Sequence, residues 1–446
     1  MLPGETQLKD FADRVLAMSQ AEQTEVLLFS SHSALTRFAN SYIHQNVEDT
    51  SVEVSVRAVT GKKIGVAGTN MLSDESLRAV VERAATLAAH QRENEDFQSL
   101  PAPQPVSRVD AWVQRTAAFG PDDRARVVAA ICDAARNAKV TAAGAFRTSA
   151  SEVAVANSLG VFAYHRETNA DINTTMMSAD SSGYAAHLSM DVNDVDGPTL
   201  AAEAIDKCLR SAHPIALEPG EYEVILEEYA VADILDFLAY LALGAQAFQE
   251  QRSFLSGHLG EKVMGENISI WDDGLAPNTI PSPFDFEGVP KQRVDFITDG
   301  VAKGIVYDTY YAGKEGKAST GHALPAGMTF GPVPSNMFLK PGTASKEEML
   351  ASVERGIWVS RFWYTRPVHP LKVIVTGMTR DGTFLIEKGK ITAPIKNLRF
   401  TQSYLEALNQ VEMIGRETSL HSAMMGVSRV PALKVRSWNF SGATEF

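Results

Sequence analysis

Residues 51–69 read SVEVSVRAVTGKKIGVAGT. Apolar and polar residues alternate on both sides of the Thr-Gly-Lys sequence at 60–62, which is typical of two half-buried strands joined by a tight turn. A further strand is expected over residues 35–46, LTRFANSYIHQN. Residues 73–90 then repeat apolar residues every three or four positions after a serine and two acidic residues, which predicts a capped helix. Strands followed by a helix predict an α+β unit over residues 20–92.

The same order of elements returns over residues 140–212, where three strand patterns precede a helix pattern, although the two units share no residue motif. Between the units lie a linker at about 93–109, rich in Pro, Gln and Ser, and a helix predicted over 121–138. We therefore expect residues 1–215 to form an N-terminal domain of two similar strand-strand-strand-helix units, which could share one sheet.

A domain boundary is expected near residues 213–220, where Pro and Gly precede a new strand pattern and after which Gly and Pro become frequent. Farther along, the T-D-G sequence at 298–300 and the R-D-G sequence at 380–382 separate alternating segments, which predicts antiparallel hairpins. The fold class is therefore α+β: an N-terminal sheet-and-helix domain, followed over residues 216–446 by a mostly antiparallel β domain with a few helices.

Composition and charge exclude several classes of protein. The net charge is 41 − 54 = −13, and Lys and Arg never run for more than two residues, so we expect no nucleic-acid partner. The two cysteines, Cys132 and Cys208, lie at apolar positions of predicted helices and are expected to be buried thiols. Two cysteines cannot build a disulfide framework, and residues 1–20 lack the pattern of a signal peptide, so a cytoplasmic location is expected.

The most apolar stretch is YAVADILDFLAYLALGAQAF, residues 229–248. Asp233 and Asp236 lie in its first half, and each would cost about 2–3 kcal/mol at the centre of a bilayer. Its apolar residues follow the spacing of one helix face, so we predict an amphipathic helix and no membrane span. It holds no pair of His ligands. His258 and Glu261 in SFLSGHLGEK could offer two metal donors, but the flanking glycines argue against a helix there, and we expect no metal site in this chain.

Candidate binding residues occur in three segments of the C-terminal half. In PFDFEGVPKQR, Asp285 and Glu287 alternate with phenylalanines, so in an extended strand both carboxylates would share one face, about 7 Å apart. Such a pair fits acid–base chemistry or a solvated strand face. His369 in RFWYTRPVHP could help clamp an acidic ligand or end a core strand, and Thr320 and His322 in STGHALP complete the set.

Taken together, several of these segments resemble the TldD/PmbA family of modulator-of-gyrase proteins and peptidases. The resemblance covers nearly the whole chain and is carried by loose motifs in a fixed order: ANSLGVFAYHRET (156–168), SFLSGHLGEKVMGENISIWDDG (253–274), KASTGHALP (317–325) and TGMTRDGTFLIEKGKITAPIKNLRFTQS (376–403). It implies two kinds of subunit. TldD-like chains carry an H-E-x-x-x-H helix before the S-x-F-S-G-type segment and a Cys near the C-terminus, and look like zinc peptidases.

TldE/PmbA-like chains lack those ligands and pair with a TldD-like partner. Here residues 229–244 contain no His, and residues 415–435 contain no Cys. The resemblance thus implies a TldE-like subunit without catalytic residues or cofactor of its own, in a heterodimeric intracellular peptidase whose partner holds the zinc and whose substrate is a peptide. A homodimeric binding protein stays open. So does a stand-alone, metal-independent enzyme of specialised metabolism for a small peptide or amide, which requires Asp285, Glu287, His322 and His369 to converge.

Overall fold

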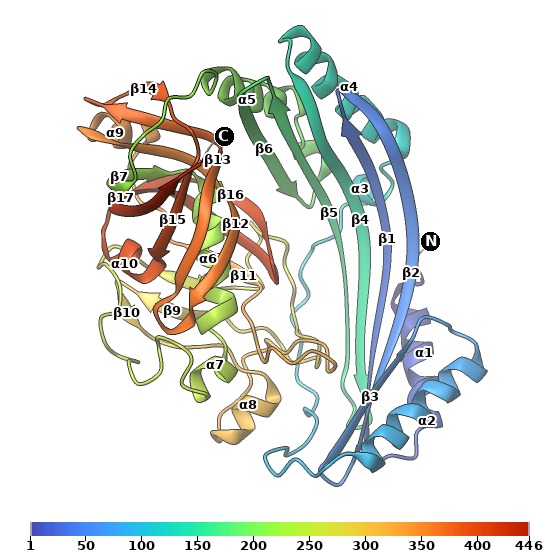
Figure 1. Cartoon of the computed structure of the whole chain (residues 1–446). Coiled ribbons are helices and arrows are strands. Elements are labelled where there is room, and N and C mark those ends of the chain that lie inside the picture. Colours follow the sequence, from blue (N-terminus) through green and yellow to red (C-terminus); the bar gives the residue numbers. More distant parts are fainter. Residues whose placement is uncertain (1, 445–446) are drawn as a thin grey trace.

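The strands form two sheets in the computed structural model, which describes residues 2–444 (Figure 1). The first sheet has six strands and carries helices, and the second has eleven strands with mostly antiparallel neighbours. The predicted α+β class, with a sheet-and-helix part followed by a mostly antiparallel β part, is confirmed. The elements before residue 215 are α1 (Gly4–Met18), β1 (Gln23–Ala39), β2 (Tyr42–Thr60), β3 (Lys63–Thr69), α2 (Asp74–His90), α3 (Gln114–Ala117), α4 (Pro121–Asn137), β4 (Thr141–Asn157), β5 (Phe162–Met177), β6 (Ser182–Ser189), η1 (Val192–Asp194) and α5 (Gly197–Arg210).

The first sheet joins the two N-terminal units along β1 and β4. Its strand order is β3-β2-β1-β4-β5-β6 and every neighbouring pair is antiparallel. Each unit packs its helix closely on its outer strand by means of a glycine. A Cβ at Gly65 of β3 would lie 2.2 Å from the Ala84 carbonyl oxygen of α2, and a Cβ at Gly183 of β6 would lie 2.2 Å from that of Ala204 in α5. The two units therefore repeat one packing solution without a common motif.

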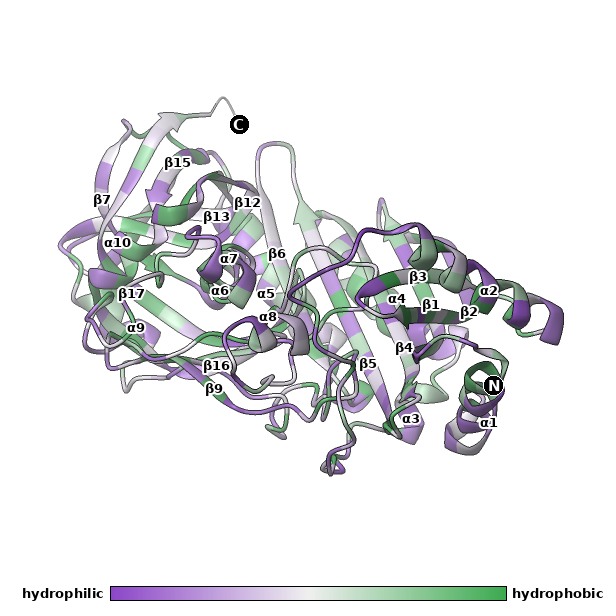
Figure 2. Ribbon diagram, turned by 90° about the horizontal axis from the view of Figure 1, so that it is seen from below, coloured by the Kyte–Doolittle hydropathy of each residue, from purple (hydrophilic) through white to green (hydrophobic). Residues whose placement is uncertain are grey.

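Within the described residues, the helices that precede residue 215 all pack on one side of this sheet, and we call its other side helix-free because none of them covers it. Leu28 of β1 packs in a core shared with α1 and α2, whereas its neighbours Leu27 and Phe29 point to the other side. In Figure 2, α1 and α2 lie beyond the first sheet as seen from the C-terminal elements. The helix-free side of the sheet therefore faces the C-terminal part of the chain.

The first hairpin differs from expectation. The turn at residues 60–62 is confirmed, because Thr60 pairs with Lys63 and Gly61 has a φ of 59°. The strand expected over residues 35–46 is wrong, because β1 and β2 meet in its middle. Asn40 and Ser41 make that turn with φ angles of 51° and 58°, and the Ser41 hydroxyl accepts a hydrogen bond from the Ala142 amide at 3.0 Å. A buried side-chain contact thus supports a turn without glycine.

The second sheet contains a closed ring of strands, β7-β12-β13-β15-β17, because β7 pairs with both β12 and β17. The ring encloses the largest apolar core, and most of the residues of α6 belong to this core. From β17 the sheet extends through β11, β8 and β9 to β10, while β14 pairs with β13 and β16 pairs with β17. The elements are β7 (Gly220–Leu226), α6 (Glu228–Ala242), α7 (Ala245–Gln249), β8 (Ile270–Asp272), β9 (Val294–Thr298), β10 (Val301–Ala302), α8 (Thr309–Lys314), β11 (Asn336–Leu339), α9 (Lys346–Ala351), β12 (Arg355–His369), η2 (Pro370–Lys372), β13 (Ile374–Glu387), β14 (Lys390–Pro394), β15 (Leu398–Ser403), α10 (Tyr404–Asn409), β16 (Val411–Ala423) and β17 (Gly426–Ala443).

The apolar stretch at 229–248 is a core helix followed by a short second helix. The two helices are separated at Gly244, which packs so closely on the Pro332 carbonyl oxygen that a Cβ at this position would lie 2.1 Å from it. Across the described residues, no helix has the length and apolar character needed to cross a membrane. Cys132 and Cys208 are both buried free thiols, as expected.

Of the two Asp-Gly turns, only one forms as predicted. The T-D-G sequence at 298–300 turns between β9 and β10. The R-D-G sequence at 380–382 does not, because it lies inside β13 where the pairing with β12 is irregular. Asp381 is buried there and accepts hydrogen bonds from Arg361 Nε at 2.6 Å and Ser182 Oγ at 2.5 Å. Those contacts hold the segment in the sheet as a bulge.

Candidate functional site

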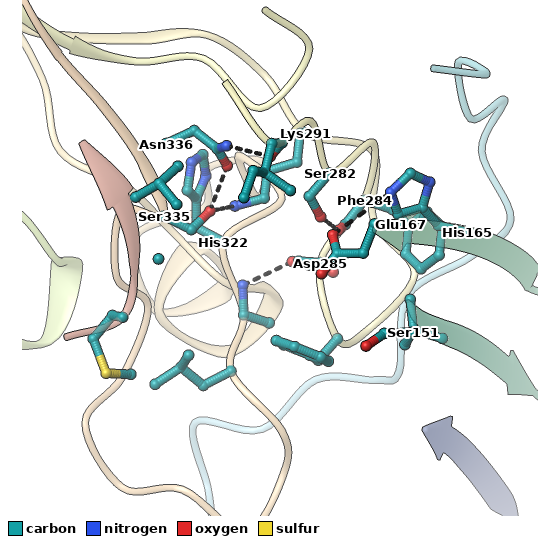
Figure 3. Close-up of a pocket in the computed structure, with 18 of the residues that line it drawn as sticks. Ser151, His165, Glu167, Ser282, Phe284, Asp285, Lys291, His322, Ser335 and Asn336 are labelled. Atoms are coloured by element: carbon teal, nitrogen blue, oxygen red, sulfur yellow. Dashed lines mark hydrogen bonds and ion pairs between the residues drawn. The ribbon is translucent and has the colours of Figure 1, made fainter. Parts of the chain in front are cut away.

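A cavity of about 300 Å³ lies between the helix-free side of the first sheet and loops of the C-terminal part (Figure 3). Sites of this kind between packed layers are the usual place for a small ligand. Apolar side chains from both parts form much of its wall, and polar groups reach it from both parts as well. The polar lining includes His165 and Glu167 of β5, and Asp285, Lys291, His322 and Ser335 of the C-terminal part.

A buried Asp–His pair fixes one wall of the cavity. Asp272 Oδ1 accepts the Nε2 proton of His322 at 2.9 Å, and Oδ2 accepts the Ser335 and Asn336 amides at 2.8 and 2.7 Å. His322 Nδ1 lies 3.0 Å from the Thr320 hydroxyl. These donors lower the pKa of Asp272 to about 2 despite its burial, while burial and the nearby Lys291 lower the pKa of His322. Asp272 and His322 together therefore clamp the start of β11.

Beside this clamp, Lys291 Nζ donates a hydrogen bond to Ser335 Oγ at 2.6 Å. The Ser335 hydroxyl in turn donates a hydrogen bond to Asn336 Oδ1 at 3.0 Å. Burial lowers the pKa of Lys291, and the charges of Asp272 and Asp285 only partly oppose that effect. Neither residue was recognised from the sequence, because 44 positions separate them and no local pattern links a lysine to a distant serine.

Asp285 does not lie on the extended strand that its alternation with phenylalanines predicts. Residues 285–288 form a tight turn closed by a bridge between Phe284 and Pro290. Asp285 Oδ1 accepts the amides of Glu287 and Val289 at 3.0 and 2.9 Å, and Oδ2 accepts that of Ala323 at 2.8 Å. Burial, reinforced by Glu287, raises the pKa of Asp285 to about 7. Its carboxylate thus joins two loops at the cavity wall.

We expect the Asp285→Asn variant to lose about 1–3 kcal/mol of unfolding free energy. Three backbone N–H groups donate to the two carboxylate oxygens of Asp285, so both oxygens must act as acceptors. An asparagine would replace one of these oxygens with an NH2 group, which would face at least one N–H donor. Urea denaturation of Asp285→Asn should be compared with Asp295→Asn, whose carboxylate is half exposed in a pair with Arg293. Equal stability of the two variants would mean that Asp285 does not hold these loops.

Glu287 points away from Asp285 into an ion cluster between the two parts of the chain. Glu25 of β1 and Arg57 of β2 are opposite each other in the sheet register and lie on its helix-free side. Arg57 Nη2 donates to Glu25 Oε2 at 2.5 Å and to Glu287 Oε1 at 3.0 Å, and Glu287 Oε2 accepts the Thr309 amide at 3.1 Å. Glu287 therefore ties the turn to the first sheet and is not directed at the cavity.

The predicted residues converge only in part. Asp285 and His322 line the cavity. Glu287 and Thr320 are not among the lining residues, although the Thr320 hydroxyl contacts His322. His369 is the exposed last residue of β12 and is not among the lining residues. The Arg366 guanidinium in the same segment stacks on Tyr364, 4.6 Å from the ring centre.

A second, more polar cavity of about 360 Å³ lies where α6 faces β5, β6 and β16. Asp233 Oδ1 accepts the Tyr404 hydroxyl at 2.6 Å, and Oδ2 accepts that of Thr365 at 2.8 Å. Asp236 Oδ1 accepts the Met424 amide at 2.9 Å. Burial raises the pKa of Asp233 to about 6, and the pKa of Asp236 also rises. Both carboxylates that α6 brings to this cavity are thus engaged with protein groups.

Of the two histidines that line this second cavity, His421 is engaged as well, whereas His187 Nε2 is buried without a hydrogen-bond partner among the described residues. His421 Nε2 lies 2.6 Å from the Ser419 hydroxyl, and burial, with Arg429 nearby, lowers the pKa of His421 to about 4. Elsewhere, His258 and Glu261 pair at 2.7 Å on an exposed turn. Within residues 2–444, no group of three or more His, Cys, Asp or Glu side chains is arranged to hold a metal ion.

Comparison with known proteins places these features in a family. Models of the PmbA/TldA metallopeptidase family match domain 1 at residues 24–88, the central domain at 115–212 and the C-terminal domain at 219–442. The metalloprotease TldD homolog of Haemophilus influenzae is 27% identical over 54% of this chain and 52% of its own length. The zinc metalloprotease TldD homolog of Saccharolobus solfataricus is 25% identical over 60% of this chain and 58% of its own. The chain thus spans about half the length of these relatives.

A solved structure shares the whole fold. The crystal structure of TldE from Thermococcus kodakarensis superimposes with a TM-score of 0.88 at 20% identity, over 98% of this chain and 100% of that one. At that identity the likeness concerns the fold alone. The C-terminal domain model by itself covers half of the 446 residues, and with the other two it spans both sheets. The chain therefore belongs to the PmbA/TldD metallopeptidase family.

Proposed function

We propose that this chain is the TldE/PmbA-like subunit of a TldD/TldE-type zinc metallopeptidase that cuts peptides, and that the zinc belongs to a TldD-like partner. One observation carries the proposal. Helix α6 stands where the family resemblance expects the H-E-x-x-x-H helix, and the two aspartates on it, Asp233 and Asp236, are bonded to other protein groups.

The donor set around α6 does not fit a catalytic zinc. Such a site needs three protein ligands and an open position for water. Tyr404 and Thr365 occupy both oxygens of Asp233, and the Met424 amide lies on Asp236 in the segment where the resemblance expects a cysteine. We therefore assign no zinc-dependent step to this chain. Its contribution to peptide cleavage would be structural: it would complete the partner's site and supply one wall for an extended peptide.

Co-expression of this chain with a TldD-like chain carrying H-E-x-x-x-H tests the pairing. We expect the two to co-elute in size-exclusion chromatography, and we expect cleavage of an unfolded peptide that stops on addition of a chelator. As a control, a partner with the first motif His replaced by Ala should still co-elute but not cleave. Chelator-sensitive cleavage by this chain alone would contradict the proposal. A stable dimer of this chain that ignores the TldD-like partner would favour a homodimeric binding protein instead.

A further inference from the structure

Lys291 differs from the other buried lysines of the described chain. Lys207 pairs with Glu203 and Glu227, both at 2.7 Å, and Lys434 pairs with Glu223 and Glu412 at 2.7 and 3.1 Å. In both cases the carboxylates raise the pKa of the lysine. Lys291 is equally buried but, within residues 2–444, forms no ion pair, and its ammonium donates a hydrogen bond to the Ser335 hydroxyl.

A buried ammonium without a directly bonded carboxylate costs free energy, because water no longer solvates it and the charges of Asp272 and Asp285 offset that loss only in part. If Lys291 had a structural role, we would expect a directly bonded carboxylate beside it, as Lys207 and Lys434 have. A buried lysine that gives up its proton readily is, in contrast, what a general base requires. The burial and the lowered pKa of Lys291 both favour this second role.

Ser335 is held in the position that a nucleophile needs. The Ser335 amide donates a hydrogen bond to Asp272, and His322 holds the other oxygen of Asp272. The backbone at Ser335 is therefore fixed in position. Its side chain is half-buried and lines the 300 Å³ cavity together with Lys291 (Figure 3). A nucleophile within hydrogen-bond reach of its base, with the base or the backbone oriented by a third group, is the recurring arrangement of covalent catalysis.

We propose that Ser335 and Lys291 form a nucleophile–base pair with which this chain hydrolyses an ester or amide bond in the cavity between the two sheets, without a metal. Asp272 and His322 are positioning residues in this proposal. It does not rest on the pairing with a TldD-like subunit, because all four residues belong to this chain.

The steps balance with water as the only co-reactant. Neutral Lys291 takes the Ser335 hydroxyl proton as Oγ forms a bond to the substrate carbonyl carbon, whose π electrons move onto its oxygen. The intermediate collapses, the bond from carbon to the leaving oxygen or nitrogen breaks, and Lys291 returns its proton to the leaving group. Water then attacks the acyl-serine while Lys291 takes one of its protons. The acid is released, and Lys291 gives that proton back to Ser335 Oγ.

The lining of the cavity indicates which substrates fit. The wall of the cavity includes apolar side chains, among them Ile280, Phe284 and Val333, which suits a short apolar acyl group. Glu167 and Asp285 bring carboxyl groups to the same cavity. A leaving group that is neutral or positively charged would therefore be accepted, and an anionic one would be repelled. Small amides of short apolar acids, whose leaving amine is neutral or positively charged, belong to this class.

Labelling with a fluorophosphonate tests the proposal on the full chain, purified alone and kept in chelator. We expect a single adduct on Ser335 by peptide mass mapping, together with hydrolysis of p-nitrophenyl butyrate. Ser335→Ala should lose both. Ser282→Ala is the matched control, because Ser282 lines the same cavity but bonds to the Phe284 carbonyl oxygen, and it should label within about twofold of the original chain.

Substitutions of Lys291 separate a base from a structural residue. Lys291→Met and Lys291→Arg should each slow labelling about 100-fold or more, because methionine has no basic nitrogen and arginine does not release its proton near neutral pH. In the original chain the labelling rate should rise with pH to a midpoint below the ordinary lysine range, and Lys291→Arg should abolish that rise. Urea denaturation checks that both variants fold. No adduct in the original chain, an adduct on another serine, or unchanged labelling of folded Lys291→Met would each overturn the proposal.

Discussion

The Arg57→Met variant should lose about 3–5 kcal/mol of unfolding free energy, the usual result of removing one partner from a buried ion cluster. Arg57 is the only cation paired with Glu25 and Glu287 among the described residues, and all three side chains are at most 11% exposed. Its loss leaves two carboxylates facing each other across the boundary between the first sheet and the C-terminal part. Urea denaturation followed by tryptophan fluorescence measures the change.

The pH dependence of this loss has a definite sign. Even beside Arg57, burial raises the pKa of Glu25 to about 7 from 4.5. A carboxyl whose pKa is raised on folding binds its proton more tightly in the folded state, so its penalty is smallest near pH 4.5 and grows as pH rises toward 7. The deficit of Arg57→Met should therefore be smaller at pH 5 than at pH 8. Arg126→Met, which removes an exposed pair with Asp123, should change stability by about 0.5 kcal/mol or less.

A loss below about 1 kcal/mol in Arg57→Met would mean that the cluster does not hold the two parts together. Glu287 would then be available to bind a ligand, as its place in the sequence first suggested. In the present account Glu287 is a structural residue.

The Lys207→Met variant should lose a similar amount, about 3–5 kcal/mol. Lys207 of α5 joins the first part of the chain to Glu227, which precedes α6 and also accepts Trp358 Nε1 at 2.6 Å and Ser360 Oγ at 3.1 Å. Lys207 lowers the pKa of Glu227 against the effect of burial. Without its ammonium, Glu227 remains buried as a charge without a directly bonded cation.

Two other lysines make this measurement specific. Lys262→Met removes an exposed pair with Glu266 and should cost about 0.5 kcal/mol or less. Lys291→Met removes a buried ammonium without a carboxylate partner, so it should leave stability unchanged or raise it. If Lys207→Met and Lys291→Met were equally destabilised, Lys291 would contribute to stability as much as Lys207 does, and the distinction between a structural Lys207 and a catalytic Lys291 would be contradicted.

Local signals in the sequence predicted the fold well where they act through the backbone. The turn at 60–62 has a glycine and alternating flanks, and it forms as predicted. The turn at Asn40 and Ser41 was missed because its support, the contact from Ser41 to Ala142, comes from a strand 101 positions away. The Asp-Gly at 381–382 misled for the same reason, since Arg361 and Ser182 hold that aspartate inside the sheet.

The candidate site could be predicted only in outline. Asp285 and His322 were singled out from their own segments, and the fold brings both to one cavity. The extended geometry expected for Asp285 was wrong, because a carboxylate that accepts three amides makes its own turn. Lys291 and Ser335 carry no local signal. Their relation appears only once β11 pairs with β8, the strand that ends at Asp272, and that pairing depends on tertiary structure.

The zinc content of the purified chain tests the central proposal most directly. Measured by plasma mass spectrometry, this chain expressed alone should hold far less than one zinc ion per molecule. The co-purified complex with a TldD-like chain should hold about one zinc ion per pair, bound by the partner's ligands. One zinc ion per molecule in the chain alone, with peptide cleavage that a chelator abolishes, would contradict the account.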